Sequence, residues 1–114
     1  MVLCMTRLIA ATLFALVAAP PALADPAEVV EVALRGDSSA LRVDVTIRHA
    51  DTGWDDYADG WRVETADGTV LGTRILHHPH VEEQPFTRSL SGVETPDGLT
   101  EVFIRSSTNV TGWA

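Results

Sequence analysis

Three of the four histidines of this 114-residue chain gather in one short segment, and their spacing is the pattern with the clearest chemistry. His77, His78 and His80 are followed at once by Glu82 and Glu83. Residues two apart in an extended chain point to the same side, with about 6.5–7 Å between their Cα atoms. His78 and His80 then aim their imidazoles together, and imidazole is a good ligand for Cu(II) and Zn(II). The segment therefore predicts a transition-metal site, to which Glu82 or Glu83 adds a carboxylate.

The same segment also fits a loop that contacts a partner. Pro79 and Pro85 hold it extended or turned and exclude a helix. In this alternative one histidine bonds backbone groups, another faces solvent, and Glu83 pairs with Arg88 to brace the loop. His49 bears on both hypotheses, because it ends a predicted strand over 41–47 and joins the cluster if that end meets the loop. His77 faces away unless the chain turns.

A second loop, over residues 50–60, is rich in carboxylates and aromatic side chains. Asp55, Asp59 and Gly60 resemble part of a calcium loop, but Tyr57 stands at an expected ligand position and the closing Glu is missing. We expect the aromatic residues to cover one end of the core and the Asp residues to cap turns. Across both loops, the candidate partner contacts are Trp54, Tyr57, Asp59, Trp61, Gln84, Phe86 and Arg88.

Signs of an enzyme are missing from the sequence. Ser89 and Ser91 are in no nucleophile-elbow context, and no glycine-rich phosphate loop occurs. A domain this small rarely builds a deep pocket. We therefore expect a non-enzymatic binding or interaction module, with a metal-handling protein as the alternative.

The N-terminus has the pattern of a secretory signal peptide. Arg7 precedes an apolar run over 8–19, and Ala22-Leu23-Ala24 is a small-x-small cleavage site. We expect residues 1–24 to be removed, with Asp25 as the first mature residue and no membrane anchor left. Cys4 leaves with the signal, so the mature chain has no thiol for disulfides or catalysis. The prediction is a periplasmic or secreted protein whose residues 25–114 form one domain.

The charge of the chain limits its partners. The formal net charge is −8, every basic residue is Arg, and loss of Arg7 brings the mature charge to about −9. Such a surface repels phosphate backbones and anionic lipid, so nucleic acid is an unexpected partner. Cations, including a divalent metal, and basic partners are compatible with this surface.

The mature chain alternates with period two almost throughout, which is typical of strands. Apolar stripes run over 41–47 and, through Val30, Val32 and Leu34, over the segment before it. Segments 61–65 and 69–76 flank Asp67-Gly68, a strong hairpin signal. Further strands are expected over 86–90 and 99–106, separated by turn-rich residues including Ser91-Gly92. The pattern predicts an all-β immunoglobulin-like or fibronectin-III-like sandwich of six to seven strands.

The end of the sandwich carries a further expectation. About eight residues follow Ser106, so a full seventh strand fits poorly and one sheet edge stays short or exposed. An exposed edge is a place where a partner adds a strand.

Three segments, HADTGWDDYADGWRV, DGTVLGTR and HPHVEEQPFTRSLSG, resemble a group of short exported bacterial proteins with an HPHVxEQPFTRS-type segment. The resemblance covers about half of the mature chain. It implies a periplasmic protein and brings no established activity, so no catalytic residue is carried over. Members of the group run on through a glycine-rich stretch and a final strand, whereas this sequence stops at Thr111-Gly112-Trp113-Ala114.

Overall fold

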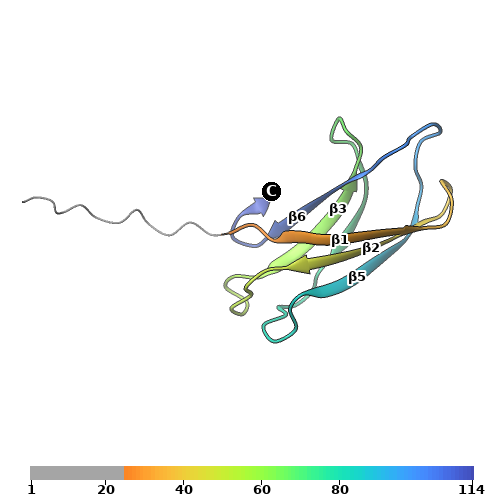
Figure 1. Cartoon of the computed structure of the whole chain (residues 1–114). Coiled ribbons are helices and arrows are strands. Elements are labelled where there is room, and N and C mark those ends of the chain that lie inside the picture. Colours follow the sequence, from red (N-terminus) through yellow and green to blue (C-terminus); the bar gives the residue numbers. More distant parts are fainter. Residues whose placement is uncertain (1–24) are drawn as a thin grey trace, which may run out of the picture.

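The computed structural model describes residues 25–114, so the predicted signal peptide lies outside the described residues. Seven strands form two antiparallel sheets that face each other like a sandwich (Figure 1). One sheet has the order β1-β2-β5 and the other β4-β3-β6-β7. The strands are β1 (Glu28–Arg35), β2 (Leu41–Arg48), β3 (Ala58–Glu64), β4 (Val70–Ile75), β5 (Phe86–Val93), β6 (Phe103–Thr108) and β7 (Gly112–Trp113). The all-β sandwich expected from the periodicity is confirmed.

The core lies between the middle strands of the two sheets. Val43, Val45 and Ile47 of β2 have no exposed surface, and Trp61 and Val63 of β3 are equally buried in the facing sheet. Burying a side chain of this size contributes roughly 1.5–3 kcal/mol. The alternation of β2 therefore fixes which face of its sheet turns inward.

The hairpin predicted around Asp67-Gly68 is confirmed. β3 pairs with β4 antiparallel, from Gly60 opposite Ile75 to Glu64 opposite Val70. Gly68 sits at φ +88°, a left-handed conformation that glycine adopts without a steric penalty. Asp67 accepts hydrogen bonds from the Thr65 and Thr69 hydroxyls, which tightens the turn.

The apolar stripe of β1 is less buried than the sequence indicates. Val32 and Leu34 pair with the buried Val45 and Val43, yet they keep 39% and 50% of their surface exposed. β1 is an edge strand of its sheet. On the same side of the sandwich, the edge strand of the other sheet is β7, which has only two residues. The inner face of β1 is thus only partly covered.

Two predicted boundaries are wrong. Ser91-Gly92, expected as a turn, lies inside β5, where Gly92 at φ +72° accompanies a register shift against β2. β5 has one more residue than β2 at this place, and the extra residue forms a bulge. Glycine with a positive φ is suited to a bulge as well as to a turn. β6 begins at Phe103 and not at Leu99. The short seventh strand agrees with the expectation.

Three connecting loops lie together at one end of the sandwich. The connections β2–β3, β4–β5 and β6–β7 meet there beside the first described residues (Figure 1). Within residues 25–114 no helix is long and apolar enough to cross a membrane.

Candidate functional site

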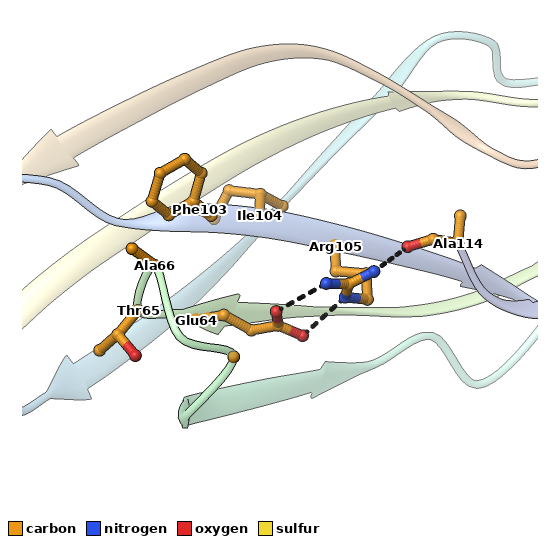
Figure 2. A pocket seen from close by; sticks show the side chains of 8 residues that line it. Glu64, Thr65, Ala66, Phe103, Ile104, Arg105 and Ala114 are labelled. Carbon is orange, nitrogen blue, oxygen red and sulfur yellow. Dashed lines mark hydrogen bonds and ion pairs between the residues drawn. The ribbon is translucent and has the colours of Figure 1, made fainter.

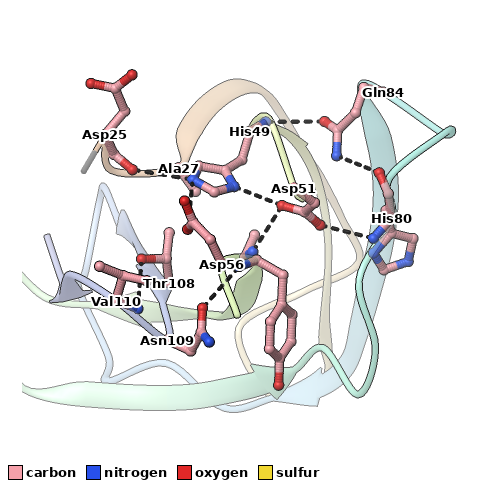
Figure 3. A network of polar contacts seen from close by, with 12 residues as sticks. Asp25, Ala27, His49, Asp51, Asp56, His80, Gln84, Thr108, Asn109 and Val110 are labelled. Atoms are coloured by element: carbon pink, nitrogen blue, oxygen red, sulfur yellow. Dashed lines mark hydrogen bonds and ion pairs between the residues drawn. The ribbon is translucent and has the colours of Figure 1, made fainter. Parts of the chain in front are cut away.

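A buried carboxylate, Asp51, joins the two loops singled out in the sequence (Figure 3). Its Oδ1 accepts hydrogen bonds from His49 Nδ1 at 2.6 Å and from the Ala58 amide at 3.0 Å. Its Oδ2 accepts the amide of His80 at 2.8 Å. Asp51 lies in the β2–β3 loop. Its hydrogen bonds thus connect this loop to the start of β3 and to the β4–β5 loop. We call Asp51, His49 and Gln84 the Asp51 cluster.

Gln84 completes the Asp51 cluster. Its side-chain oxygen accepts the His49 amide at 3.0 Å, and its Nε2 donates to the carbonyl of His80 at 2.9 Å. On the other side of the His49 ring, Nε2 lies 3.2 Å from the carbonyl oxygen of Asp25. The end of β2 therefore meets the histidine loop, which was the condition for His49 to join the cluster, and the connection is made by hydrogen bonds of Gln84 to the backbone of His49 and His80.

The His80 ring is buried and belongs to a second group of contacts. It stacks on Phe86 with ring centroids 3.9 Å apart, and its Nε2 faces Arg88 Nη2 at 2.9 Å. Because a guanidinium only donates, His80 Nε2 is the acceptor and the proton of the neutral ring lies on Nδ1. Burial, then the charge of Arg88, lowers the pKa of His80 below its usual value. His80 Nδ1 has no hydrogen-bond partner among the described residues.

The predicted metal ligands are only partly brought together. The rings of His78 and His80 lie on the same side with centroids 4.6 Å apart, as the extended spacing requires. His49 points its nitrogens at Asp51 and Asp25, and His77 and Glu82 are exposed. Glu83 bonds Arg88 at 3.1 Å, as the loop-bracing alternative predicts. Residues 25–114 contain no cluster of three or more His, Cys, Asp or Glu side chains placed to hold a metal ion.

Trp54 is the most prominent apolar side chain at this end of the sandwich. It is 65% exposed and meets Tyr57 edge to face, with ring centroids 5.5 Å apart. Asn109, from the β6–β7 turn, fixes this loop. The side chain of Asn109 accepts a hydrogen bond from the Tyr57 backbone amide at its Oδ1 (2.8 Å) and donates one from its Nδ2 to the Trp54 carbonyl (2.9 Å). The backbone amide of Asn109 donates to the Tyr57 carbonyl at 3.1 Å. An exposed aromatic residue thus lies on a loop whose backbone is hydrogen-bonded to Asn109 on both sides of the Asp55-Asp56 pair.

Several predicted contact residues have other positions. Trp61 and Phe86 are core residues, 0% and 2% exposed, so neither is available as a surface contact. Both lie on strands and face inward with the period of two. Asp59 is half-buried, and its carbonyl accepts the Leu76 amide at 3.0 Å. Gln84 and Arg88 are half-buried and hold the histidine loop from inside.

Sequence reasoning missed Asp51 and Asn109. Asp51 was one of several carboxylates in its loop, and nothing in the sequence separates the buried one from the exposed ones. Asn109 occurs in an Asn-Val-Thr triplet that fits a glycosylation acceptor. An Asn in a short turn between strands was the available signal, since its side chain often bonds neighbouring backbone.

No family model matches this chain, and no solved structure is significantly similar to it. The chain is homologous to a protein of the archaeon Halomicrobium mukohataei named "Putative lipoprotein". The two are 43% identical over 88 residues, which cover 76% of this chain and 43% of that protein. The chain therefore spans less than half of the length of this relative. This relative is archaeal, whereas the motifs of the sequence led us to expect bacterial relatives.

Proposed function

We propose that this chain is an exported, non-enzymatic binding module that recognises a protein partner with its loop end. The observation that carries the proposal is Trp54, whose side chain is 65% exposed while Asn109 bonds its carbonyl and the amide of Tyr57. Exposed aromatic residues on rigid backbone are typical anchors of protein interfaces, because they bury much area at little entropic cost.

The strand order supports a fibronectin-III-like module in particular. Sheets of the order β1-β2-β5 and β4-β3-β6-β7 correspond to a three-stranded and a four-stranded sheet of that fold. Modules of this architecture carry loops at the two ends of the sandwich, and such loops are common binding surfaces. Fold alone does not define function, which depends on the residues of the loops.

Charge indicates the character of the partner. Asp55 and Asp56 lie between the exposed Trp54 and the half-buried Tyr57 in the sequence, and the chain has a net charge of −8. A partner surface with an apolar pocket and basic or neutral surroundings complements them. The signal-like N-terminus and the homologue's name both support export, so we expect the partner in the periplasm or outside the cell.

The test compares two exposed apolar positions on different parts of the surface. Tagged protein, Trp54→Ala and Val70→Ala are used to capture cross-linked partners from the envelope and extracellular fractions of the producing cell. Val70 lies on β4 and is also largely exposed. We expect a partner retained by Val70→Ala and lost with Trp54→Ala. Identical captured sets for both variants would rule out the loop end as the binding surface.

A metal-handling role is the second candidate, favoured by the adjacent His78 and His80 rings and the unpartnered Nδ1 of His80. The His80–Arg88 contact opposes it, because a guanidinium repels a bound cation. Titration with Cu(II) and Zn(II) compares the protein with His78→Ala and with His77→Ala, an exposed neighbouring control. Micromolar or tighter binding that only His78→Ala loses supports a site. Equal weak binding by all three removes this candidate.

A further inference from the structure

The first described residues are fixed to the loop end of the sandwich. The Asp25 carbonyl lies 3.2 Å from His49 Nε2, and the Ala27 carbonyl accepts the Ser106 hydroxyl at 2.5 Å. Ala27 is itself part of the hydrophobic core, with 6% of its surface exposed. The backbone is therefore held in place from Asp25 onwards, and Asp25 is also the predicted first residue of the mature chain.

Asp56 contains the one buried carboxylate oxygen of residues 25–114 that has no hydrogen bond. This oxygen, Oδ1, lies 3.7 Å from His49 Nε2, which is beyond hydrogen-bonding distance. Glu64 shows what is missing, since both of its carboxylate oxygens accept hydrogen bonds from Arg105 (Figure 2). A buried acceptor without a donor destabilises the fold, so Asp56 Oδ1 is suited to a hydrogen-bond donor, and best to a cationic one.

Asp25 and Asp56 line the same pocket of about 400 Å³, and both approach the Nε2 end of the His49 ring (Figure 3). The pocket also contains Glu28 and Arg48, which pair with each other at 3.5 Å. The nitrogen and the carbonyl oxygen of one residue are at most about 3.6 Å apart. The backbone nitrogen of Asp25 is therefore at most about 7 Å from the ring nitrogen that Asp56 faces.

Cleavage of the signal peptide changes the charge of this nitrogen. Removal of residues 1–24 converts the neutral amide of Asp25 into an α-ammonium group, which carries a positive charge below about pH 8. The sequence contains no lysine, so this group is the only amine of the mature chain. It offers three N–H donors and a positive charge, and Asp56 Oδ1 lacks both.

We propose that the α-ammonium of Asp25, formed by removal of residues 1–24, binds the carboxylate of Asp56. This inference rests on the export proposed above and adds a structural consequence to the cleavage. In the precursor the nitrogen of Asp25 is an uncharged amide, so the ion pair forms only in the mature chain.

The ion pair acts on the turn that carries Trp54. The carbonyl of Asp56 accepts the Thr52 amide at 2.9 Å, and its amide donates to the Gly53 carbonyl at 3.2 Å. Asp56 thus closes this turn with its backbone, while its side chain faces the N-terminus. Cleavage therefore anchors the exposed Trp54 more firmly in the exported protein than in its precursor.

The lack of lysine makes the test selective, because an amine-acetylating reagent modifies the α-amine alone. Protein exported by the producing cell is used, and mass spectrometry identifies its first residue. Acetylation removes the charge of the α-ammonium. We expect acetylation to lower Tm by about 4 °C in the parent and in Asp55→Asn, an exposed neighbour, and to leave Tm unchanged in Asp56→Asn. The loss in the parent should shrink at high salt, which screens ion pairs.

The rate of acetylation gives a second readout that a merely structural role of Asp56 would not move. A paired ammonium reacts slowly, so the amine of the parent should react several-fold more slowly than that of Asp56→Asn. The substitution keeps the size of the side chain and the backbone bonds of the turn, so the variant folds.

Three outcomes would overturn the proposal. They are an equal loss of Tm in Asp55→Asn and Asp56→Asn, equal acetylation rates in the parent and Asp56→Asn, and a mature chain that begins at a residue other than Asp25. None of them involves the capture of a partner by Trp54. The failure of this inference is therefore distinguishable from the failure of the proposed binding function.

Discussion

The Nδ1 of His49 lies 2.6 Å from the carboxylate of Asp51, and both side chains are almost completely buried. The same carboxylate receives the amides of Ala58 and His80. Two loops and the start of a strand therefore depend on one side chain that carries no exposed surface. The packing of both loops is therefore expected to depend on Asp51.

Asp51→Asn is expected to destabilise the fold. Both carboxylate oxygens of Asp51 accept N–H donors, whereas the asparagine side chain has one oxygen and one NH₂ group. The NH₂ group therefore faces an N–H donor of the protein, and neither has an acceptor. A buried donor left without an acceptor costs about 1–3 kcal/mol. Urea unfolding followed by tryptophan fluorescence measures the loss. Asp55→Asn, an exposed neighbour, is the control and should stay within about 0.5 kcal/mol of the parent. Equal stability of all three proteins would contradict the role of Asp51.

Stability is expected to fall as pH drops through the range where histidine titrates. Burial first, then Arg88 and His78, lower the pKa of His80, while Glu83 and Asp51 act in the opposite direction. The unfolded chain then binds a proton at about pH 6.5 that the folded chain binds only at lower pH. The stabilisation that neutral His80 gives the fold is complete above pH 6.5 and is lost as pH falls towards the pKa of His80 in the folded chain. The free energy of unfolding then changes by at most about 1.4 kcal/mol per pH unit.

Unfolding of His80→Phe at several pH values checks this assignment. Phenylalanine keeps the stacking on Phe86 and removes the titrating group, so the slope between pH 6.5 and 5 should become smaller. His77→Phe, at an exposed position, should keep the slope of the parent. A slope unchanged in His80→Phe would show that another group is responsible.

Asn109→Ala is expected to loosen the loop that carries Trp54. The substitution removes the bonds to the Tyr57 amide and the Trp54 carbonyl, each worth about 0.5–1.5 kcal/mol. Faster hydrogen exchange of the Tyr57 amide and lower fluorescence anisotropy of Trp54 are the expected signals. Val110→Ala, exposed and adjacent, serves as the control. If exchange at Tyr57 does not change, Asn109 does not hold this loop.

Glu64 gives rise to a second pH effect at lower pH. Hydrogen bonds from Arg105 and then Arg62 hold the pKa of this carboxyl below its usual value. The stabilisation that ionised Glu64 gives the fold is complete above the pKa of this carboxyl in the unfolded chain. It is lost as pH falls towards the lower pKa of Glu64 in the folded chain. Glu64→Gln should therefore be less stable at pH 7 and lose less stability on acidification below pH 4.5. Thermal unfolding across this range measures both, and a parallel pH profile would contradict the assignment.

The sequence predicted the parts of the fold that depend on local pattern. The alternation of Val43, Val45 and Ile47 defined the inner face of β2, and Asp67-Gly68 defined the hairpin. The exposure of Val32 and Leu34 was missed, because it depends on how far the facing sheet extends and not on their own segment. Ser91-Gly92 was misjudged because glycine with a positive φ serves a bulge as well as a turn.

The candidate site was predictable only in outline. The spacing of His78 and His80 correctly placed their rings on one side of the chain. The bond of Asp51 to the His80 amide spans 29 residues, and that of Asn109 to Trp54 spans 55. Such pairs depend on which loops share an end of the sandwich, and a single sequence contains no signal for which of several Asp or Asn residues turns inward.

The Asp51 cluster also bears on how this protein can change over evolutionary time. The side chains that fix the loop end point inward, whereas Trp54, Asp55, His77 and Val81 point outward and bond little. Surface residues of the loops can therefore be replaced without dismantling their support. Diversification of these outer positions, by natural drift or in a designed library, can alter recognition while the scaffold persists.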